Sequence, residues 1–206
     1  NQTTDSVFKK QIEAAGHDVI GESFIQFEVY PVTEIPDANW VFFTSPQSVR
    51  SVCEQVELSK NIQIAVLGKG TAKALAEFGL KADFTGVDSD THQVAQDFLS
   101  HIGNQTVYLP VGKQTLGVLE AVIPADQLIK QTVYDTLSKS VKLEGEPDVL
   151  VFTSPSNVAS YLQQFQLKSY QRIIAIGNTT ADFILSESLG VEVDISDYPN
   201  EAGLAE

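Results

Sequence analysis

One segment of this chain occurs twice, and this repeat limits the fold more than any other feature. Residues 40–49 read Trp-Val-Phe-Phe-Thr-Ser-Pro-Gln-Ser-Val, and residues 150–158 read Leu-Val-Phe-Thr-Ser-Pro-Ser-Asn-Val. Each copy begins with an apolar run typical of a strand that is covered on both faces. The Ser-Pro pair that follows is typical of a helix start, because Ser caps the first turn and Pro lacks an amide hydrogen there. Each copy therefore predicts a strand, a tight turn and a helix.

A second pair of segments repeats in the same register. Ile-Ala-Val-Leu-Gly at 64–68 is matched by Ile-Ile-Ala-Ile-Gly at 173–177. The separation is 153 − 44 = 109 residues for the first pair and 177 − 68 = 109 for the second. Two copies of one α/β unit explain both repeats. The helices that the pattern predicts cover 46–56 and 71–78 in the first copy, and 155–164 and 180–189 in the second.

The remaining pattern predicts how the two copies are connected. Strands separated by helices at this spacing indicate open parallel sheets with right-handed crossovers. Two β-type runs, 23–30 and 128–136, are expected to join the lobes. The predicted fold is α/β, with two similar parallel-sheet lobes, flavodoxin-like or Rossmann-like, joined by a two-stranded linker. The first lobe is built from both chain ends, 1–23 and 138–206, and the second covers 24–137 including the linker strands.

Composition limits the location and the partners. The 206 residues include 13 basic and 27 acidic side chains, a net charge of −14, which argues against nucleic acid or an anionic membrane as a partner. No apolar run approaches the roughly 20 residues that span a bilayer. The single cysteine permits no internal disulfide, which fits a reducing compartment. A cytoplasmic protein is expected, and because nothing indicates oligomerisation, a monomer.

The start of the sequence also carries an expectation. The chain contains no Met and opens at Asn1 in a helix-like segment. We therefore expect that the full protein has a strand before Asn1 and that methionines were lost as modified residues. The mass of the intact protein tests this expectation.

The turns that follow the predicted strands are the candidate binding site. Ligands of open α/β sheets bind beyond the carboxyl ends of the strands, and helix N-termini there present amide hydrogens that suit carboxylates or phosphates. Two lobes would present two such rims to a shared cleft. The alternative is that these Ser and Thr residues only cap helices and the glycines only form turns. The candidates are Thr44, Ser45, Gly70, Thr71, Gly112, Lys113, Ser154, Ser156, Asn157, Thr179 and Thr180.

Other chemistry has little support in the sequence. Neither a phosphate-binding P-loop nor a Gly-x-Gly-x-x-Gly motif occurs, and the three histidines have no partners at metal-ligand spacing, so no metal is expected. Cys53 lies in a predicted helix among valines and is interpreted as a core residue. Tyr134 stands out, because its phenol could face the cleft as a donor from a strand between the lobes. The alternative is a tyrosine that only packs, with its hydroxyl in water.

Five motifs in order resemble the uroporphyrinogen-III synthase family, and they extend over nearly the whole sequence. They are Val-Phe-Phe-Thr-Ser-Pro-Gln-Ser-Val (41–49), Ala-Val-Leu-Gly-Lys-Gly-Thr-Ala (65–72), Thr-Val-Tyr-Asp-Thr (132–136), Val-Phe-Thr-Ser-Pro-Ser-Asn-Val (151–158) and Ala-Ile-Gly-Asn-Thr-Thr-Ala (175–181).

The resemblance implies an activity. A protein of this family is a cyclising hydro-lyase of tetrapyrrole synthesis that works without a cofactor. It closes linear hydroxymethylbilane with loss of water and inverts the last pyrrole ring, which gives uroporphyrinogen III. Hydroxymethylbilane synthase is an expected partner, by hand-over of the substrate.

The resemblance also implies residue roles. Tyr134 would assist departure of the substrate hydroxyl. Lys113 could supply a cation, although many relatives have arginine in this loop and residues 114–117 lack it. The residues that would line the cleft and bind acetate and propionate groups are Thr71, Ser154, Ser156, Asn157, Thr179 and Thr180.

Two other functions remain open at this point. One is a two-lobed binding protein that closes on a small anion without chemistry. The other is a catalytically silent synthase-like domain with a regulatory role. Supplying hydroxymethylbilane and identifying the macrocycle isomer that accumulates separates these readings.

Overall fold

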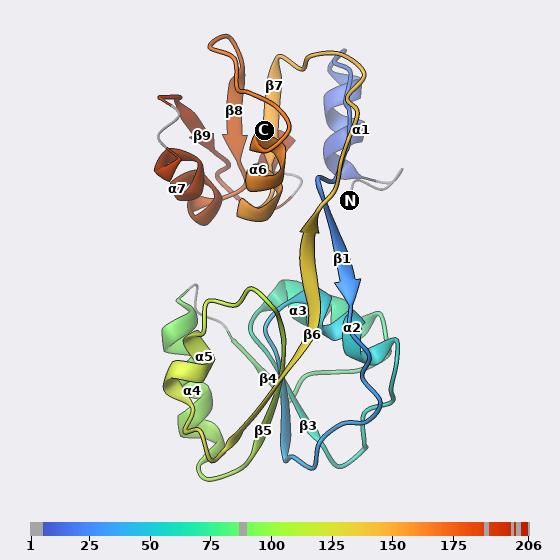
Figure 1. Cartoon of the computed structure of the whole chain (residues 1–206), viewed down its shortest axis with the longest axis vertical. Helices are drawn as coiled ribbons and strands as arrows, with labels where there is room; N and C mark the ends of the chain where they lie inside the picture. Colours follow the sequence, from blue (N-terminus) through green and yellow to red (C-terminus); the bar gives the residue numbers. More distant parts are fainter. Residues whose placement is uncertain (1–5, 87–89, 188–189, 199, 201–202, 206) are drawn as a thin grey trace. The chain divides into compact units, whose positions relative to one another are not determined.

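The computed structural model describes residues 6–86, 90–187, 190–198, 200 and 203–205 (Figure 1). The chain divides into two compact units. Unit 1 comprises Asn1–Gln26 and Leu137–Glu206, and unit 2 comprises Phe27–Thr136. The described residues form a mixed α/β fold with seven α-helices, and their strands pair mostly in parallel.

A six-stranded sheet runs through unit 2 in the order β1-β6-β5-β2-β3-β4. Its strands are β1 Ile25–Val29, β2 Trp40–Phe43, β3 Gln63–Val66, β4 Phe84–Thr85, β5 Val107–Gly112 and β6 Leu128–Ser138. From β6 to β4 all neighbours are parallel. The arrows of β1 and β6 point in opposite directions in Figure 1. The sequence predicts strands at 23–30 and 128–136. Both predictions are confirmed, because β1 lies within the first range and β6 covers the second.

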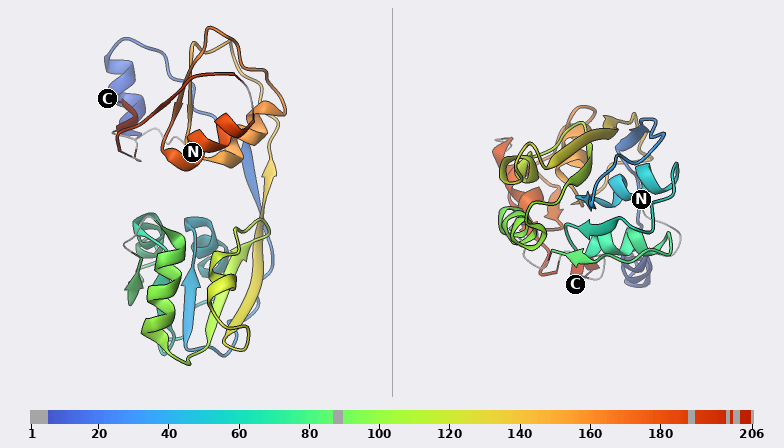
Figure 2. Two further views of the ribbon diagram at one scale, coloured as in Figure 1. Left: turned by 90° about the vertical axis from the view of Figure 1, so that its left-hand side faces the viewer. Right: turned by 90° about the horizontal axis from the view of Figure 1, so that it is seen from below.

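Helices cover both faces of the unit 2 sheet (Figures 1 and 2). Helices α4 Thr91–Ile102 and α5 Val118–Val122 pack on one face, and α2 Pro46–Cys53 and α3 Lys69–Ala76 pack on the other. Successive strand side chains alternate between faces. Trp40 and Phe42 therefore join the first cluster, Val41 and Phe43 join the second, and all four are buried. This two-sided burial explains the unbroken apolar run in the sequence.

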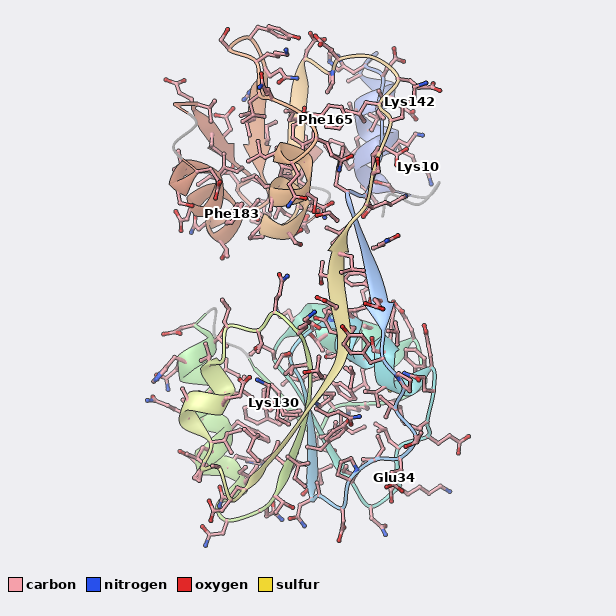
Figure 3. The ribbon with its side chains drawn as sticks, viewed as in Figure 1. Lys10, Glu34, Lys130, Lys142, Phe165 and Phe183 are labelled. Carbon is pink, nitrogen blue, oxygen red and sulfur yellow. The ribbon has the colours of Figure 1, made fainter. Side chains whose placement is uncertain are left out.

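Unit 1 contains a parallel three-stranded sheet in the order β7-β8-β9. Its elements are β7 Val149–Phe152, β8 Arg172–Ala175, β9 Val193–Ile195, α1 Val7–Ala14, α6 Pro155–Leu162, α7 Asn178–Ser186 and the 3-10 helix η1 Gly203–Ala205. The core joins side chains of β7, β8, α6 and α7 to Phe24. Phe165 and Phe183, both labelled in Figure 3, pack against this cluster.

The sequence repeat is also a repeat of strand register. Trp40 lies opposite Gln63, and Val149 lies opposite Arg172. The separations are 149 − 40 = 109 and 172 − 63 = 109 residues, which is the offset found in the sequence. In both copies the order is strand, helix, strand, helix, strand.

The predicted starts of two helices were wrong. Helices α3 and α7 begin at Lys69 and Asn178, two residues earlier than predicted, because Gly68 and Gly177 take the N-cap position. Thr71 and Thr180 therefore lie inside the first helical turn, and both are buried. Within the described part of the chain, no helix has the length and apolar character that crossing a bilayer requires.

Phe98 of α4 is the core position whose loss is easiest to measure. Its ring lies edge-to-face on Trp40, 5.4 Å between centroids, and Trp40 is the only tryptophan of the chain. We expect Phe98→Ala to lower the free energy of unfolding of unit 2 by about 3–5 kcal/mol, because it leaves a cavity in the core. Urea unfolding followed by tryptophan fluorescence measures this. The control Gln96→Ala, at an exposed position of the same helix, should change stability by less than about 0.5 kcal/mol; equal transitions for the two variants would contradict the assigned core.

Candidate functional site

The strand order of unit 2 creates a crevice between β2 and β5. From β2 the chain builds outward through β3 to β4, and from β5 it builds in the other direction to β6. The loops that leave β2 and β5 therefore diverge, and ligands of open α/β sheets bind at such a point. Thr44 and Ser45 follow β2, while Gly112 ends β5. Three of the predicted site residues thus meet at the switch point.

A bulge in the sheet brings Tyr134 to the same place. Val111 of β5 pairs with Thr132, but Gly112 pairs with Tyr134, so β6 contains one extra residue. The Tyr134 phenol oxygen lies 3.1 Å from Ser45 Oγ, at the start of α2. The Tyr134 ring meets Phe27 edge-to-face, with 5.7 Å between centroids.

Gly112 makes room for the tyrosine ring. A Cβ atom at residue 112 would lie 2.7 Å from the Tyr134 ring, which is closer than real Cβ contacts come. The missing side chain at this position therefore lets the ring lie where it does, and any Cβ here would force the ring to shift.

Lys113 is already paired. Its Nζ lies 2.9 Å from Oδ2 of Asp135, a buried carboxylate whose Oδ1 accepts the amide hydrogen of Thr136. The hydrogen bond and charge of Asp135 raise the pKa of the Lys113 ammonium. The backbone N–H of Lys113 donates to the carbonyl of Tyr134 at 2.8 Å. Lys113 thus connects the loop after β5 to β6. Its ammonium, which was predicted to be a cation for a substrate carboxylate, is already paired with the carboxylate of Asp135.

A cavity of about 200 Å³ opens at the switch point. Its lining comprises Thr44, Ser45, Leu67, Thr91, Gly112, Gln114, Thr115, Leu116, Gly117, Val118, Leu119, Glu120 and Tyr134. Among the residues that the structure describes, this lining contains no Lys or Arg, and its one carboxylate, Glu120, forms an ion pair of 2.8 Å with Lys130 on β6 (Figure 3). The cavity therefore offers hydroxyls, amides and apolar surface to a ligand.

Several lining residues were missed from the sequence. Thr91 is the first residue of α4, and residues 114–117 directly follow the predicted pair Gly112 and Lys113. Both positions come after a strand, so the rule that selected the other turns could have found them. Glu120 had no such signal, because it lies within α5.

The other predicted residues lie elsewhere. Gly70 and Thr71 lie in the first turn of α3, Gly70 exposed and Thr71 buried, and neither lines this cavity. In unit 1, Ser154 caps α6 and its Oγ lies 3.1 Å from Ser156 Oγ. Thr179 is exposed and Thr180 is buried.

Asn157 has a structural contact that the sequence did not suggest. Its Oδ1 accepts the backbone N–H of Phe24 at 2.9 Å, and its Nδ2 donates to Ser154 Oγ at 3.1 Å. The side chain therefore fastens the start of β1 to α6, across 133 residues of sequence.

A larger cavity, about 470 Å³, lies in unit 1. Its lining includes Pro147 and Gln171, which come just before β7 and β8, so it lies at the amino ends of these strands. None of the predicted residues line it. Because open α/β sheets bind ligands at the carboxyl ends, the smaller cavity in unit 2 is the better candidate for the site.

Comparison with known proteins identifies the family. The sequence model of the family "Uroporphyrinogen-III synthase HemD" matches residues 6–206. The chain belongs to the uroporphyrinogen-III synthase family. A curated relative, uroporphyrinogen-III synthase of Chlorobaculum parvum, is 28% identical over 201 residues, which covers 81% of each protein.

Solved structures support the same family. The uroporphyrinogen-III synthetase of Helicobacter pylori matches with a TM-score of 0.68 at 25% identity, and the match covers 88% of each chain. A mutant uroporphyrinogen III synthase of Thermus thermophilus matches in fold, with a TM-score of 0.58 at 21% identity over 96% of this chain and 90% of that one.

Gly112→Ala tests the close packing between residue 112 and the Tyr134 ring. The added methyl group should force the Tyr134 ring to move and lower the free energy of unfolding by about 1–3 kcal/mol. The matched change Gly70→Ala has open space around it, and because it lies in a helix it should stabilise by up to about 1 kcal/mol. Thermal and urea unfolding of both variants measure the difference. Equal stability of the two variants would show that the ring does not lie against residue 112.

Cys53 should be unreactive in the folded protein. Burial raises the pKa of its thiol to about 11, so only about one molecule in a thousand carries the thiolate at pH 8. In the unfolded chain, with an ordinary pKa, about a quarter is thiolate at that pH. Alkylation by iodoacetamide should therefore be roughly 100-fold slower for the folded protein than in urea. Similar rates in both states would contradict a thiol whose pKa is raised by partial burial.

Proposed function

We propose that this protein closes hydroxymethylbilane to uroporphyrinogen III, with loss of water and inversion of the last pyrrole ring. Membership of the uroporphyrinogen-III synthase family supports the proposal. The observation that carries it is the placement of the Tyr134 phenol beside Ser45, over a cavity at the switch point of the unit 2 sheet. The reaction is that of a cyclising hydro-lyase.

The proposed reaction needs one proton donor for the departing hydroxyl and control of the substrate conformation. The pyrrole nitrogen of the substrate can itself expel the hydroxyl, which leaves an azafulvene, and Tyr134 donates a proton to the departing oxygen. Ring closure at the substituted carbon must then outrun closure at the free carbon. Holding a flexible chain in one reactive fold can contribute several kcal/mol to such a choice.

The size and lining of the cavity suggest which part of the substrate it holds. About 200 Å³ is less than the roughly 300–1,000 Å³ of sites that enclose a whole small ligand. We assign it to the terminal ring that carries the hydroxymethyl group. Because Lys113 and Lys130 are each paired with a carboxylate, hydroxyls and backbone amides at helix starts are the proposed anchors for the substrate carboxylates.

The remaining expectations stay predictions. They are the carboxylate-binding roles of Gly70, Thr71, Ser154, Ser156, Asn157, Thr179 and Thr180, the two-lobe organisation with its linker and predicted boundaries, the monomeric state, the cytoplasmic location and the hand-over from hydroxymethylbilane synthase.

Exchange of Tyr134 tests the assignment. We expect Tyr134→Phe to slow formation of uroporphyrinogen III by roughly 100-fold or more, because it removes the donor but keeps the ring. Lys113→Ala should cost less than about 10-fold, because Lys113 is engaged by Asp135. An assay that generates hydroxymethylbilane and separates the inverted from the non-inverted macrocycle measures both.

Equal or reversed effects of the two variants would contradict the role of Tyr134. A wild-type protein that leaves only the non-inverted macrocycle would contradict the proposed function itself and would favour a binding or regulatory role.

A further inference from the structure

The hydrogen bonds around Ser45 determine what its hydroxyl can do. Ser45 Oγ accepts the backbone N–H of Ser48 at 3.0 Å as the N-cap of α2. The Ser48 hydroxyl has used its one hydrogen, because it donates to the Ser45 carbonyl at 2.8 Å, and it accepts the Ser45 N–H at 3.3 Å. The remaining contact of Ser45 Oγ is the Tyr134 phenol oxygen at 3.1 Å.

The contact between Ser45 and Tyr134 can run in two directions. If Tyr134 donates, its hydrogen points at Ser45 and is not available in the cavity. If Ser45 donates, the Tyr134 hydrogen is left to point elsewhere. Ser45 Oγ already accepts one hydrogen bond at the positive end of a helix, which makes it a poorer acceptor and a better donor. The cap therefore favours Ser45 as the donor.

The Tyr134 ring has little other freedom. Three of its outer atoms occupy the space that a Cβ at residue 112 would need, and its plane stands nearly at right angles to the ring of Phe27. The position of the phenol oxygen is thus set by packing, and the direction of its hydrogen depends on which of the two hydroxyls donates.

We propose that Ser45 is a positioning residue that turns the Tyr134 proton toward the substrate. The inference rests on the proposed function and deepens it. As the C–O bond of the hydroxymethyl group breaks, its electron pair stays on the oxygen, which takes the Tyr134 proton and leaves as water. The Ser45 hydrogen bond stabilises the phenolate that results. Ring closure later releases one proton from the substrate, and this proton restores the phenol.

Three substitutions separate this role from helix capping. Ser45→Thr keeps the hydroxyl and the cap. Ser45→Gly keeps most of the cap but has no hydroxyl, and Ser45→Asp caps well but can only accept a hydrogen bond, so it draws the Tyr134 proton away. We expect Ser45→Thr to stay within about 3-fold of the wild-type kcat, and Ser45→Gly and Ser45→Asp to lose roughly 30-fold or more. For Ser45→Gly, KM should change by less than about 3-fold, because the loss arises in the transition state.

Melting temperatures distinguish the outcomes. All three variants should melt close to the wild type, because each retains a capping group or glycine. A kcat of Ser45→Gly or Ser45→Asp near the wild-type value would overturn the positioning role and leave a plain helix cap, while the proposed function would stand. A wild-type protein that forms no uroporphyrinogen III would overturn both.

Discussion

The candidate site depends on the close packing of the Tyr134 ring against residue 112, which has no side chain. Gly112 has no Cβ, and the Tyr134 ring occupies the space that a Cβ would need. The bulge in β6 places the tyrosine at this point, and the N-cap of α2 holds its hydroxyl. The end of β5, the bulge in β6 and the start of α2 therefore meet at the Tyr134 phenol. The strands β5 and β6 are neighbours in the sheet, and α2 directly follows β2. In the proposed proton transfer, a phenol that is held in this way does not have to be ordered again at each turnover.

The charges in unit 2 are consistent with a site that uses neutral hydrogen-bond donors. The protein carries a net charge of −14, and its proposed substrate is polyacidic. Lys113 and Lys130, two cations next to the lining or paired with it, are bound to Asp135 and Glu120. This pairing is why neutral donors are the proposed anchors for the carboxylates. Neutral donors suit a reaction whose difficulty is geometric, because a strong charge field would bind substrate and transition state alike without raising kcat.

Much of the fold could be predicted from the sequence, because a buried parallel strand and a capped helix each leave a strong local pattern. The offset of 109 residues reappears in the strand register, and Tyr134 lies in a predicted strand. Local patterns gave the wrong helix start where both a glycine and a threonine were available for the N-cap position. Glycine, not threonine, takes the N-cap of α3 and α7, so Thr71 and Thr180 lie deeper than a capping residue would.

Contacts between segments that are far apart in the chain could not be predicted from a single sequence. The bulge that pairs Gly112 with Tyr134 depends on which strands are neighbours, and so does the ion pair between Lys113 and Asp135. The hydrogen bond from Phe24 to Asn157 is of the same kind. The motifs therefore indicated candidate residues, and the strand order was needed to group Thr44, Ser45, Gly112 and Tyr134 around one cavity.

The central claim is that Ser45 and Tyr134 act as one donor unit, and a double-mutant cycle measures this most directly. The rate of uroporphyrinogen III formation is compared for the wild type, Ser45→Gly, Tyr134→Phe and the double variant. If the serine works only through the phenol, the double variant is no slower than Tyr134→Phe alone, because the phenol is already gone. Losses that multiply in the double variant would contradict the account, since they would show that the two hydroxyls act independently.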